Sequence, residues 1–450
     1  MATVLAVDVG TSSTRAQVFG ERGEPDGELA QERYSGERDP DRLVEVARAA
    51  IGEALHGRRV DAAGLSCFGH SLLPLDPAGR PLTPLLDWRD ARSAEQAREL
   101  GRRLGREELH ERTGCYPHPS FWPAKLRWLA EADPEAFRAA RRFVSFGEFL
   151  LGSILGEEAP TSLSTASSTG LLDLRARAWD RALLEEVGVG EEQLPRIADE
   201  PVGDEPPWYP AVIDGVCSNL GAGCVGPARA ALMVGTSGAL RLLYEADEPR
   251  PRRGLFIYVH PERRIAEGGA LSDGGNLHRW LDDTLAPQQA SSLAERPADC
   301  HGLTFLPLLG GERSLGWTTA ATGAVTGLRL ETTADDLRQA AMEAVALRFA
   351  EIAECLPEVS EVVATGGALA ADRDWVQIVA DALERPVEVS AVDEASLRGA
   401  AVVALERLGC SVSAAAVHEV VEPRPERFAA LRAARIRQRE LYVGLVDERS

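Results

Sequence analysis

The sequence predicts an α/β fold built from two related lobes. Short β-branched strands alternate with helical patterns along the chain, a mixture typical of α/β proteins. An apolar strand, a Gly-Thr-Ser turn and a second strand occur at Gly10 and again at Gly235, half the chain length later. Similarity at this scale suggests an internal duplication, although so short a motif also recurs by chance. The length of 450 residues agrees with two or three domains.

The first half opens with a predicted β-hairpin. Its strands are Val4 to Val7 and Arg15 to Phe19, joined by turn residues 10–13. Apolar residues at helical spacing then predict a helix over 41–56, and a strand follows over 60–65. Further helices are predicted over 91–104, 122–132 and 146–155.

The second half repeats the hairpin and adds a helical layer. Strands are predicted over 231–234, 239–244, 265–267, 303–305 and 362–364. Helices are predicted over 334–356, 373–383 and 394–408. Turn residues Gly226 and Pro227 are the expected hinge, which divides the chain into domains 1–226 and 227–450.

Composition excludes several functions. The formal net charge of −21 disfavours nucleic acid and anionic lipid as partners. The single lysine, Lys125, lies outside any phosphate-binding loop of the P-loop type and outside a protein-kinase pattern. Seven cysteines without a C-x-x-C pair, no signal peptide and no long apolar run predict a cytoplasmic protein without a membrane span. The oligomeric state stays open, a homodimer included.

The two Gly-Thr-Ser turns are the candidate phosphate site. Glycine allows close approach of the backbone, and hydroxyl and N–H groups donate to phosphate oxygens. The predicted residues are Gly10, Thr11, Ser12, Ser13, Gly235, Thr236 and Ser237. Asp8, at the end of the first strand, is a candidate Mg²⁺ ligand through water. Each turn alone would also fit an ordinary hairpin.

Asp214 is the candidate catalytic residue. It follows an apolar strand and opens a helix of small residues, including Gly215 and Gly221. A carboxylate at the lobe boundary can accept the proton of an attacking hydroxyl during phosphoryl transfer. Asp is also a favoured helix N-cap, so a purely structural role is the alternative.

Polar and aromatic residues of the first half are candidates for a sugar pocket. His70 and Ser71 follow a strand, and Trp88, Asp90 and Arg92 form a W-x-D-x-R cluster. An indole can lie against a sugar ring while charged groups bind its hydroxyls. A half-buried histidine and an aspartate cap would explain His70 and Asp90 equally well.

Taken in order, these motifs resemble the FGGY carbohydrate kinase family of the actin and hexokinase superfamily. The resemblance rests on segments 8–12, 88–92, 113–114, 125–129, 166–171, 214–215, 235–238, 311–314, 366–367, 375–377 and 394–401. It implies two actin-like (ribonuclease H-like) domains around a central cleft, with ATP and Mg²⁺ as cofactors. It also implies Asp214 as general base and Gly366, Gly367 and Gln377 in the adenosine region.

Within the family, segments 70–72, 76–84, 214–221 and 268–276 look most like gluconate kinases. Gluconate is therefore the first substrate expectation, with xylulose, ribulose or glycerol as alternatives. The chain departs from the family pattern at Gly69, Ser162, Leu315 and Thr322. These departures motivate a second class, a non-catalytic sugar- or nucleotide-binding protein on the same fold. An activase-type ATPase would need bridging cysteines, for which the spacing offers no obvious set.

Overall fold

The computed structural model describes residues 2–261, 263–290, 292–318 and 320–446. The first half contains β1 Thr3–Val9, β2 Ser13–Gly20, β3 Ala30–Arg33, α1 Pro40–Leu55, β4 Ala62–Cys67, β5 Leu73–Leu75, α2 Ala94–Leu104, α3 Arg106–Thr113, α4 Trp122–Ala132, α5 Pro134–Ala139, β6 Arg142–Val144, α6 Phe146–Leu155, α7 Leu163–Ser168, β7 Leu172–Asp173, β8 Ala178–Trp179, α8 Arg181–Val187, β9 Val212–Ile213 and α9 Asp214–Gly221.

The second half contains β10 Gly226–Val234, β11 Gly238–Glu245, β12 Phe256–His260, β13 Arg264–Leu271, α10 Gly275–Thr284, β14 Thr304–Leu306, β15 Ala324–Thr326, α11 Ala334–Cys355, β16 Glu361–Thr365, α12 Gly367–Ala371, α13 Arg373–Leu383, β17 Val387–Ser390, α14 Ala395–Arg407, β18 Val417–Val421 and α15 Pro425–Leu445. In the described part of the chain, no helix combines the length and the apolar character that crossing a membrane requires.

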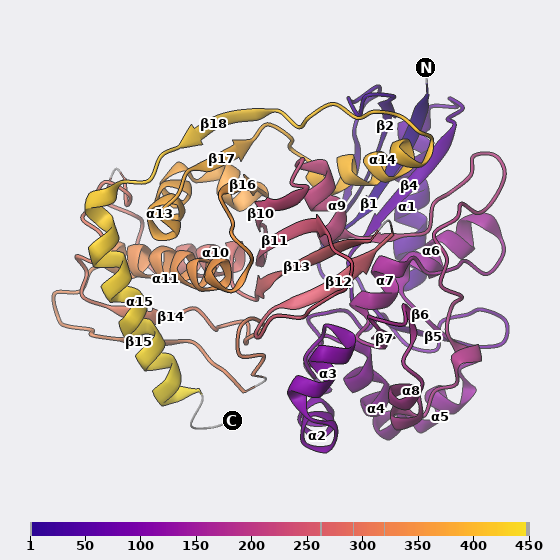
Figure 1. Cartoon of the computed structure of the whole chain (residues 1–450), viewed down its shortest axis with the longest axis horizontal. Coiled ribbons are helices and arrows are strands. Elements are labelled where there is room, and N and C mark those ends of the chain that lie inside the picture. Colours follow the sequence, from indigo (N-terminus) through magenta and orange to yellow (C-terminus); the bar gives the residue numbers. More distant parts are fainter. Residues whose placement is uncertain (1, 262, 291, 319, 447–450) are drawn as a thin grey trace.

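Each half is built on one large mixed sheet beside short two-stranded ones, and the two large sheets share a topology (Figure 1). In the first sheet β1 pairs antiparallel with β2 and parallel with β4, in the order β3-β2-β1-β4-β9. In the second sheet β10 pairs antiparallel with β11 and parallel with β16, and the central order is β13-β11-β10-β16-β17. β12 and β18 extend this sheet at its two edges. The repeated strand order supports the internal duplication that the two Gly-Thr-Ser turns suggested.

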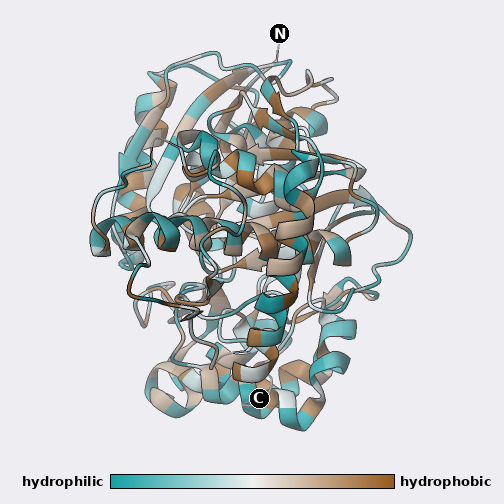
Figure 2. Cartoon of the chain, turned by 90° about the vertical axis from the view of Figure 1, so that its left-hand side faces the viewer, coloured by the Kyte–Doolittle hydropathy of each residue, from teal (hydrophilic) through white to brown (hydrophobic). Residues whose placement is uncertain are grey.

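Alternating side chains of β1 bury both faces of the first sheet. Leu5, Val7 and Val9 pack with α1 and α6, whereas Val4 and Ala6 pack against α14. In the second lobe α11 and α13 cover one face of the sheet. The opposite face of β11, β12 and β13 packs against first-lobe residues near α9. Brown residues on the interior strands and teal residues on the outer helices show this segregation (Figure 2).

The two lobes are joined by crossing helices. α14, from the second half of the sequence, packs on α9 and on β1 and β4 of the first lobe (Figure 1). The crossing is close because Gly221 of α9 and Gly399 of α14 carry no side chains. A Cβ at Gly221 would lie 1.8 Å from the Ala395 carbonyl oxygen, and one at Gly399 would lie 1.9 Å from that of Cys217. The crossing therefore depends on glycine at both positions.

Most predicted elements are confirmed, with shifts at their ends. The predicted helix over 41–56 is α1, and Asp39 caps it by accepting from the Asp41 and Arg42 amides. The expected hinge residues Gly226 and Pro227 open β10, which continues to Val234, and the division into domains 1–226 and 227–450 stays a prediction. The turn signals there mark an irregular strand start, because the pairing of β10 with β11 shifts register between Gly226 and Ala231.

Candidate active site

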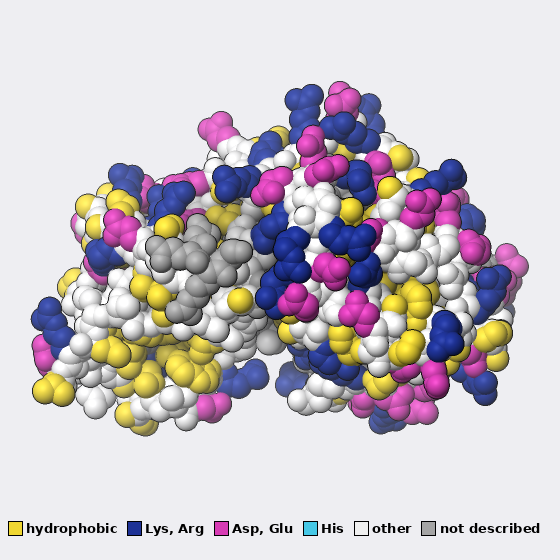
Figure 3. Space-filling model, turned by 90° about the horizontal axis from the view of Figure 1, so that it is seen from below, with side chains coloured by type: hydrophobic (Ala, Val, Ile, Leu, Met, Phe, Trp, Pro, Cys, Tyr) yellow, Lys and Arg dark blue, Asp and Glu magenta, His cyan; other side chains and the backbone are white. Residues whose placement is uncertain are grey.

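A cavity of about 240 Å³ lies where the two lobes meet. Both Gly-Thr-Ser turns border it, one from each lobe, and the start of α9 forms part of its wall. Seen from below, the molecule is indented between its two lobes (Figure 3). The cavity thus collects side chains from both halves of the sequence.

A backbone hydrogen bond closes each turn, but the second turn is one residue shorter than the first. The Gly10 amide donates to the Ser13 carbonyl and the Gly235 amide donates to the Ser237 carbonyl, each at 2.9 Å. The residues of the turns that line the cavity are Gly10, Thr11, Ser12, Thr236 and Ser237. Hydroxyl-bearing residues of both lobes therefore border the same space, which suits a chain of phosphates.

Backbone packs tightly behind the second turn. A Cβ at Gly274 would come within 2.8 Å of the Ser237 carbonyl carbon. Gly366 has φ +90°, and a Cβ there would lie 2.6 Å from the Val234 carbonyl oxygen. Gly366 thus lies against the end of β10, beside the second turn, in a backbone conformation that favours glycine.

Asp8 lies at the end of β1 and is 4% exposed. Its Oδ1 accepts from the Ser66 hydroxyl at 2.7 Å, and its Oδ2 pairs with Arg15 at 3.2 Å. Burial raises the pKa of the Asp8 carboxyl, while Ser66 and Arg15 oppose the shift. Carboxylate and hydroxyl oxygens around this point are the hard ligands that Mg²⁺ takes, directly or through water, so the donor set fits that ion.

Asp214 is the first residue of α9 and lines the cavity. Ile213 occupies the N-cap position and no side-chain cap bond forms, so the alternative of a plain cap is wrong. Burial raises the pKa of the Asp214 carboxyl to about 6, against the opposing charge of Arg241. A carboxylate with such a pKa can take up a proton near neutral pH.

His70 reaches the cavity from the segment after β4. Its Nδ1 donates to the Ser168 carbonyl at 2.7 Å, and burial lowers the pKa of the ring to about 3. The neutral ring therefore keeps Nε2 as an acceptor for a ligand hydroxyl. Lys125 holds this segment, since its Nζ donates to the carbonyls of His70 and Ser120. Burial lowers the pKa of Lys125 to about 7.

The residues of the W-x-D-x-R cluster do not all reach the cavity. Only Trp88 lines the cavity, whereas Asp90 binds Arg92 and faces an adjoining pocket beside Trp88. The Arg92 guanidinium lies 4.2 Å over the Trp128 ring. Asp90 does not cap α2, whose N-cap residue is Ser93. The pair therefore supports the segment that carries Trp88.

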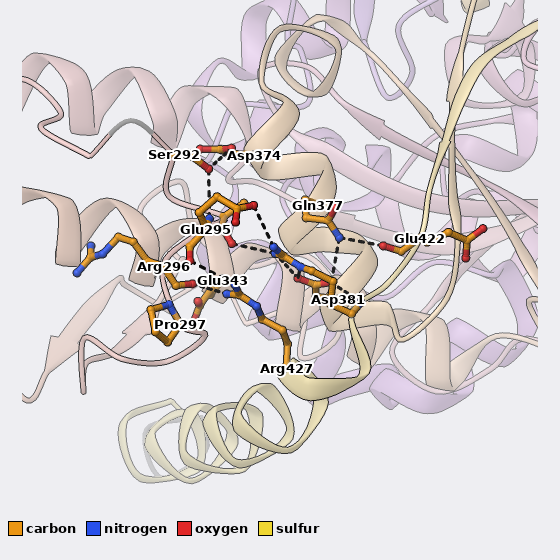
Figure 4. Close-up of polar contacts among 12 residues, drawn as sticks. Ser292, Glu295, Arg296, Pro297, Glu343, Asp374, Gln377, Asp381, Glu422 and Arg427 are labelled. Atoms are coloured by element: carbon orange, nitrogen blue, oxygen red, sulfur yellow. Dashed lines mark hydrogen bonds and ion pairs between the residues drawn. The ribbon is translucent and has the colours of Figure 1, made fainter.

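Several predicted residues do not line the cavity. The Ser71 hydroxyl is buried and accepts from the Phe146 amide at 3.0 Å. Gln377 lies on α13, where it donates to Asp381 and to the Glu422 carbonyl, each at 3.0 Å (Figure 4). These contacts give both side chains structural roles that sequence spacing does not reveal. The other predicted residues absent from the lining are Ser13, Gly235, Gly366 and Gly367.

Sequence reasoning missed much of the cavity wall. The residues concerned are Arg15, Phe121, Arg241, Phe256, Tyr258 and Trp317. Arg241 follows the second turn at an alternate strand position, so strand periodicity was the available signal. The aromatic residues come from segments far apart in the chain and carry no local motif.

Comparison with known sequences decides the family. Residues 3–201 match the N-terminal domain of the FGGY family of carbohydrate kinases, and residues 230–406 match its C-terminal domain. The chain belongs to the FGGY family of carbohydrate kinases. It is therefore an ATP-dependent sugar kinase, as the resemblance of its motifs implied.

Named FGGY relatives span almost the whole chain. The gluconokinase of Bacillus subtilis (strain 168) is 27% identical over 93% of this chain and 90% of its own length. The xylulose kinase of Streptomyces rubiginosus is 32% identical over 88% of this chain and 86% of its own. The crystal structure of gluconate kinase from Lactobacillus acidophilus superposes with a TM-score of 0.89, at 24% identity and 99% and 98% coverage. The predicted two-domain actin-like fold is confirmed.

Proposed function

We propose that this FGGY kinase transfers the terminal phosphoryl group of Mg-ATP to a hydroxyl of a small sugar acid, with gluconate as its first substrate. The observation that carries the proposal is Asp214, at the cavity between the two Gly-Thr-Ser turns. In this role its carboxylate accepts the proton of the attacking hydroxyl. The oxygen of that hydroxyl then forms a bond to the terminal phosphorus while the bond to ADP breaks, and ADP is the leaving group.

The triphosphate is assigned to the two turns, and Mg²⁺ to Asp8. One cavity is bordered by Thr11, Ser12, Thr236 and Ser237, and Asp8 also lines it. The metal would neutralise phosphate charge while Arg15 and Ser66 hold the Asp8 carboxylate. The sugar is assigned to the aromatic side of the cavity, near Trp88, His70 and Tyr258.

The choice of gluconate rests on sequence patterns and on two relatives named gluconokinase, each 27% identical. Because other relatives are named xylulose kinase and glycerol kinase, neutral sugars and polyols are the second candidate class of acceptor. We expect ADP release with Mg-ATP and D-gluconate to exceed that with D-xylulose, D-ribulose or glycerol, and to vanish without Mg²⁺. An active ketopentose with silent gluconate would overturn the substrate but not the kinase.

A pH profile tests the base. Since the pKa of Asp214 is about 6, the carboxylate that accepts protons is the main form above pH 6 and is half protonated at pH 6. We expect kcat/KM to level off above pH 7 and to fall about tenfold per unit well below pH 6. Circular dichroism across the same range separates titration from unfolding. A flat profile from pH 5 to 8 would contradict the assignment.

A further inference from the structure

Arg241 projects from β11 into the cavity in a space that the sheet leaves for it. It pairs across the sheet with Gly268 of β13. A Cβ at Gly268 would lie 2.2 Å from the Leu240 carbonyl oxygen and 2.7 Å from the Arg241 Cγ, so both the neighbouring backbone and the arginine side chain require glycine there. The guanidinium carbon lies 3.3 Å from the Cβ position of Gly215, beside the start of α9. Arg241 is thus placed next to the catalytic aspartate.

This buried cation has no counter-ion in contact. Arg241 is 7% exposed, and within the described ranges its Nη2 has no hydrogen-bond partner and its guanidinium forms no ion pair. Its Nε makes only a long contact of 3.4 Å with Asn219 Oδ1. Burial lowers the pKa of Arg241, and the charges of Asp214 and Tyr258 oppose this shift only in part. A buried charge without a contact ion pair is unfavourable. Such a group is suited to meet an anion from the ligand.

A second cation lies on the same wall. The Arg313 guanidinium is 4.8 Å above the Trp88 ring, and its Nη2 donates to the Leu271 carbonyl at 2.6 Å. Its Nε lacks a partner among the described residues. Proximity to Arg241 contributes to the lowered pKa of Arg313, although burial is the larger cause. Two like charges thus face the cavity at its aromatic side.

We propose that Arg241, assisted by Arg313, binds a carboxylate of the acceptor and so selects sugar acids over neutral sugars. This inference rests on the proposed function and identifies its specificity-determining residues. Arg15 forms ion pairs with Asp8 and with Glu394. Among the other charged residues that line the cavity, Arg241 and Arg313 face the single carboxylate of Asp214. Tyr258 and Trp88 place these cations on the sugar side, whereas the hydroxyl-bearing turns serve the triphosphate. A guanidinium offers paired donors to a carboxylate.

The test compares acceptors that differ only at the anionic group. With wild-type enzyme we expect D-gluconate to have a KM about 10- to 100-fold lower than D-gluconamide, the range for a hydrogen bond to a charged group. In Arg241→Met this preference should disappear while KM for ATP stays unchanged. Arg241→Lys should restore part of it. Arg250→Met, which removes an exposed arginine of the same lobe, is the matched control and should change nothing.

Other outcomes would overturn the inference in distinct ways. Equal KM values for gluconate and gluconamide in wild type would refute a carboxylate subsite. A uniform loss of kcat with every acceptor, with a raised KM for ATP, would assign Arg241 to the transferred phosphoryl group. Stabilisation against heat by gluconate alone gives a readout independent of turnover, and it should be lost in Arg241→Met. If gluconate stabilised the wild-type protein but no acceptor were phosphorylated, the proposed kinase function would be refuted and the carboxylate subsite at Arg241 would stand.

Discussion

Replacing Asp214 by asparagine is expected to lower kcat by a factor of about 10² to 10⁴ while ATP still binds. Asparagine keeps the size of the side chain but cannot accept the proton from the attacking hydroxyl. The two Gly-Thr-Ser turns do not involve this side chain, so nucleotide affinity should stay near the wild-type value. Steady-state ADP release and calorimetric titration with ATP measure the two quantities separately.

The control for this variant is Asp283→Asn, which changes an exposed aspartate on α10. It should retain wild-type kcat and KM. If Asp214→Asn turned over gluconate at the wild-type rate, another group would have to be the base. If it lost ATP binding as well, the residue would belong to the nucleotide site instead.

Gly399→Ala should lower the free energy of unfolding by about 3 kcal/mol, the upper part of the usual range for overpacking. The added methyl group would lie 1.9 Å from the Cys217 carbonyl oxygen, which belongs to the backbone of α9 and cannot rotate away. The helices must separate, and α14 then loses contact with the first sheet. Urea denaturation followed by circular dichroism gives the change.

The same substitution at Gly52, Gly52→Ala, is expected to change the free energy of unfolding in the opposite direction. Gly52 is exposed on α1, and its Cβ position has no atom within 4 Å. Alanine there should raise the free energy of unfolding by about 0.5–1 kcal/mol, because it restricts the unfolded chain. Similar gains in both variants would show that helix propensity, and not the crossing of α9 and α14, governs Gly399.

Local patterns predicted the parts of the site that local chemistry builds. The hairpin around Gly10, its counterpart around Gly235 and the strand that leads to Asp214 all depend on short-range signals. These signals place the two Gly-Thr-Ser turns and Asp214 at the carboxyl ends of strands, and the fold brings these three groups together. Sequence alone could not give the distance between lobes, because long-range packing sets it.

Other features depend on contacts that no local pattern carries. Gln377 has the spacing of a ligand residue, yet the packing of α13 against the segment after β18 gives it Asp381 and Glu422 as partners. Arg241 looks like an ordinary strand residue until Gly268, which follows much later in the chain, is placed opposite it. The assignment of α14 to the second half likewise conceals that its apolar face packs on the first lobe.

The packing of α14, which belongs to the second half of the sequence, on the first lobe has a consequence for synthesis on the ribosome. The first sheet is complete at Ile213, but the helix that covers Val4, Ala6 and Ala62 begins only at Ala395. During the intervening translation, one apolar side of the nascent first lobe has no partner. Domains usually fold as they emerge, N-terminal first. In this chain the first lobe completes that side of its core only after α14 has emerged from the ribosome. Until then, the apolar surface that α14 covers can bind chaperones or aggregate.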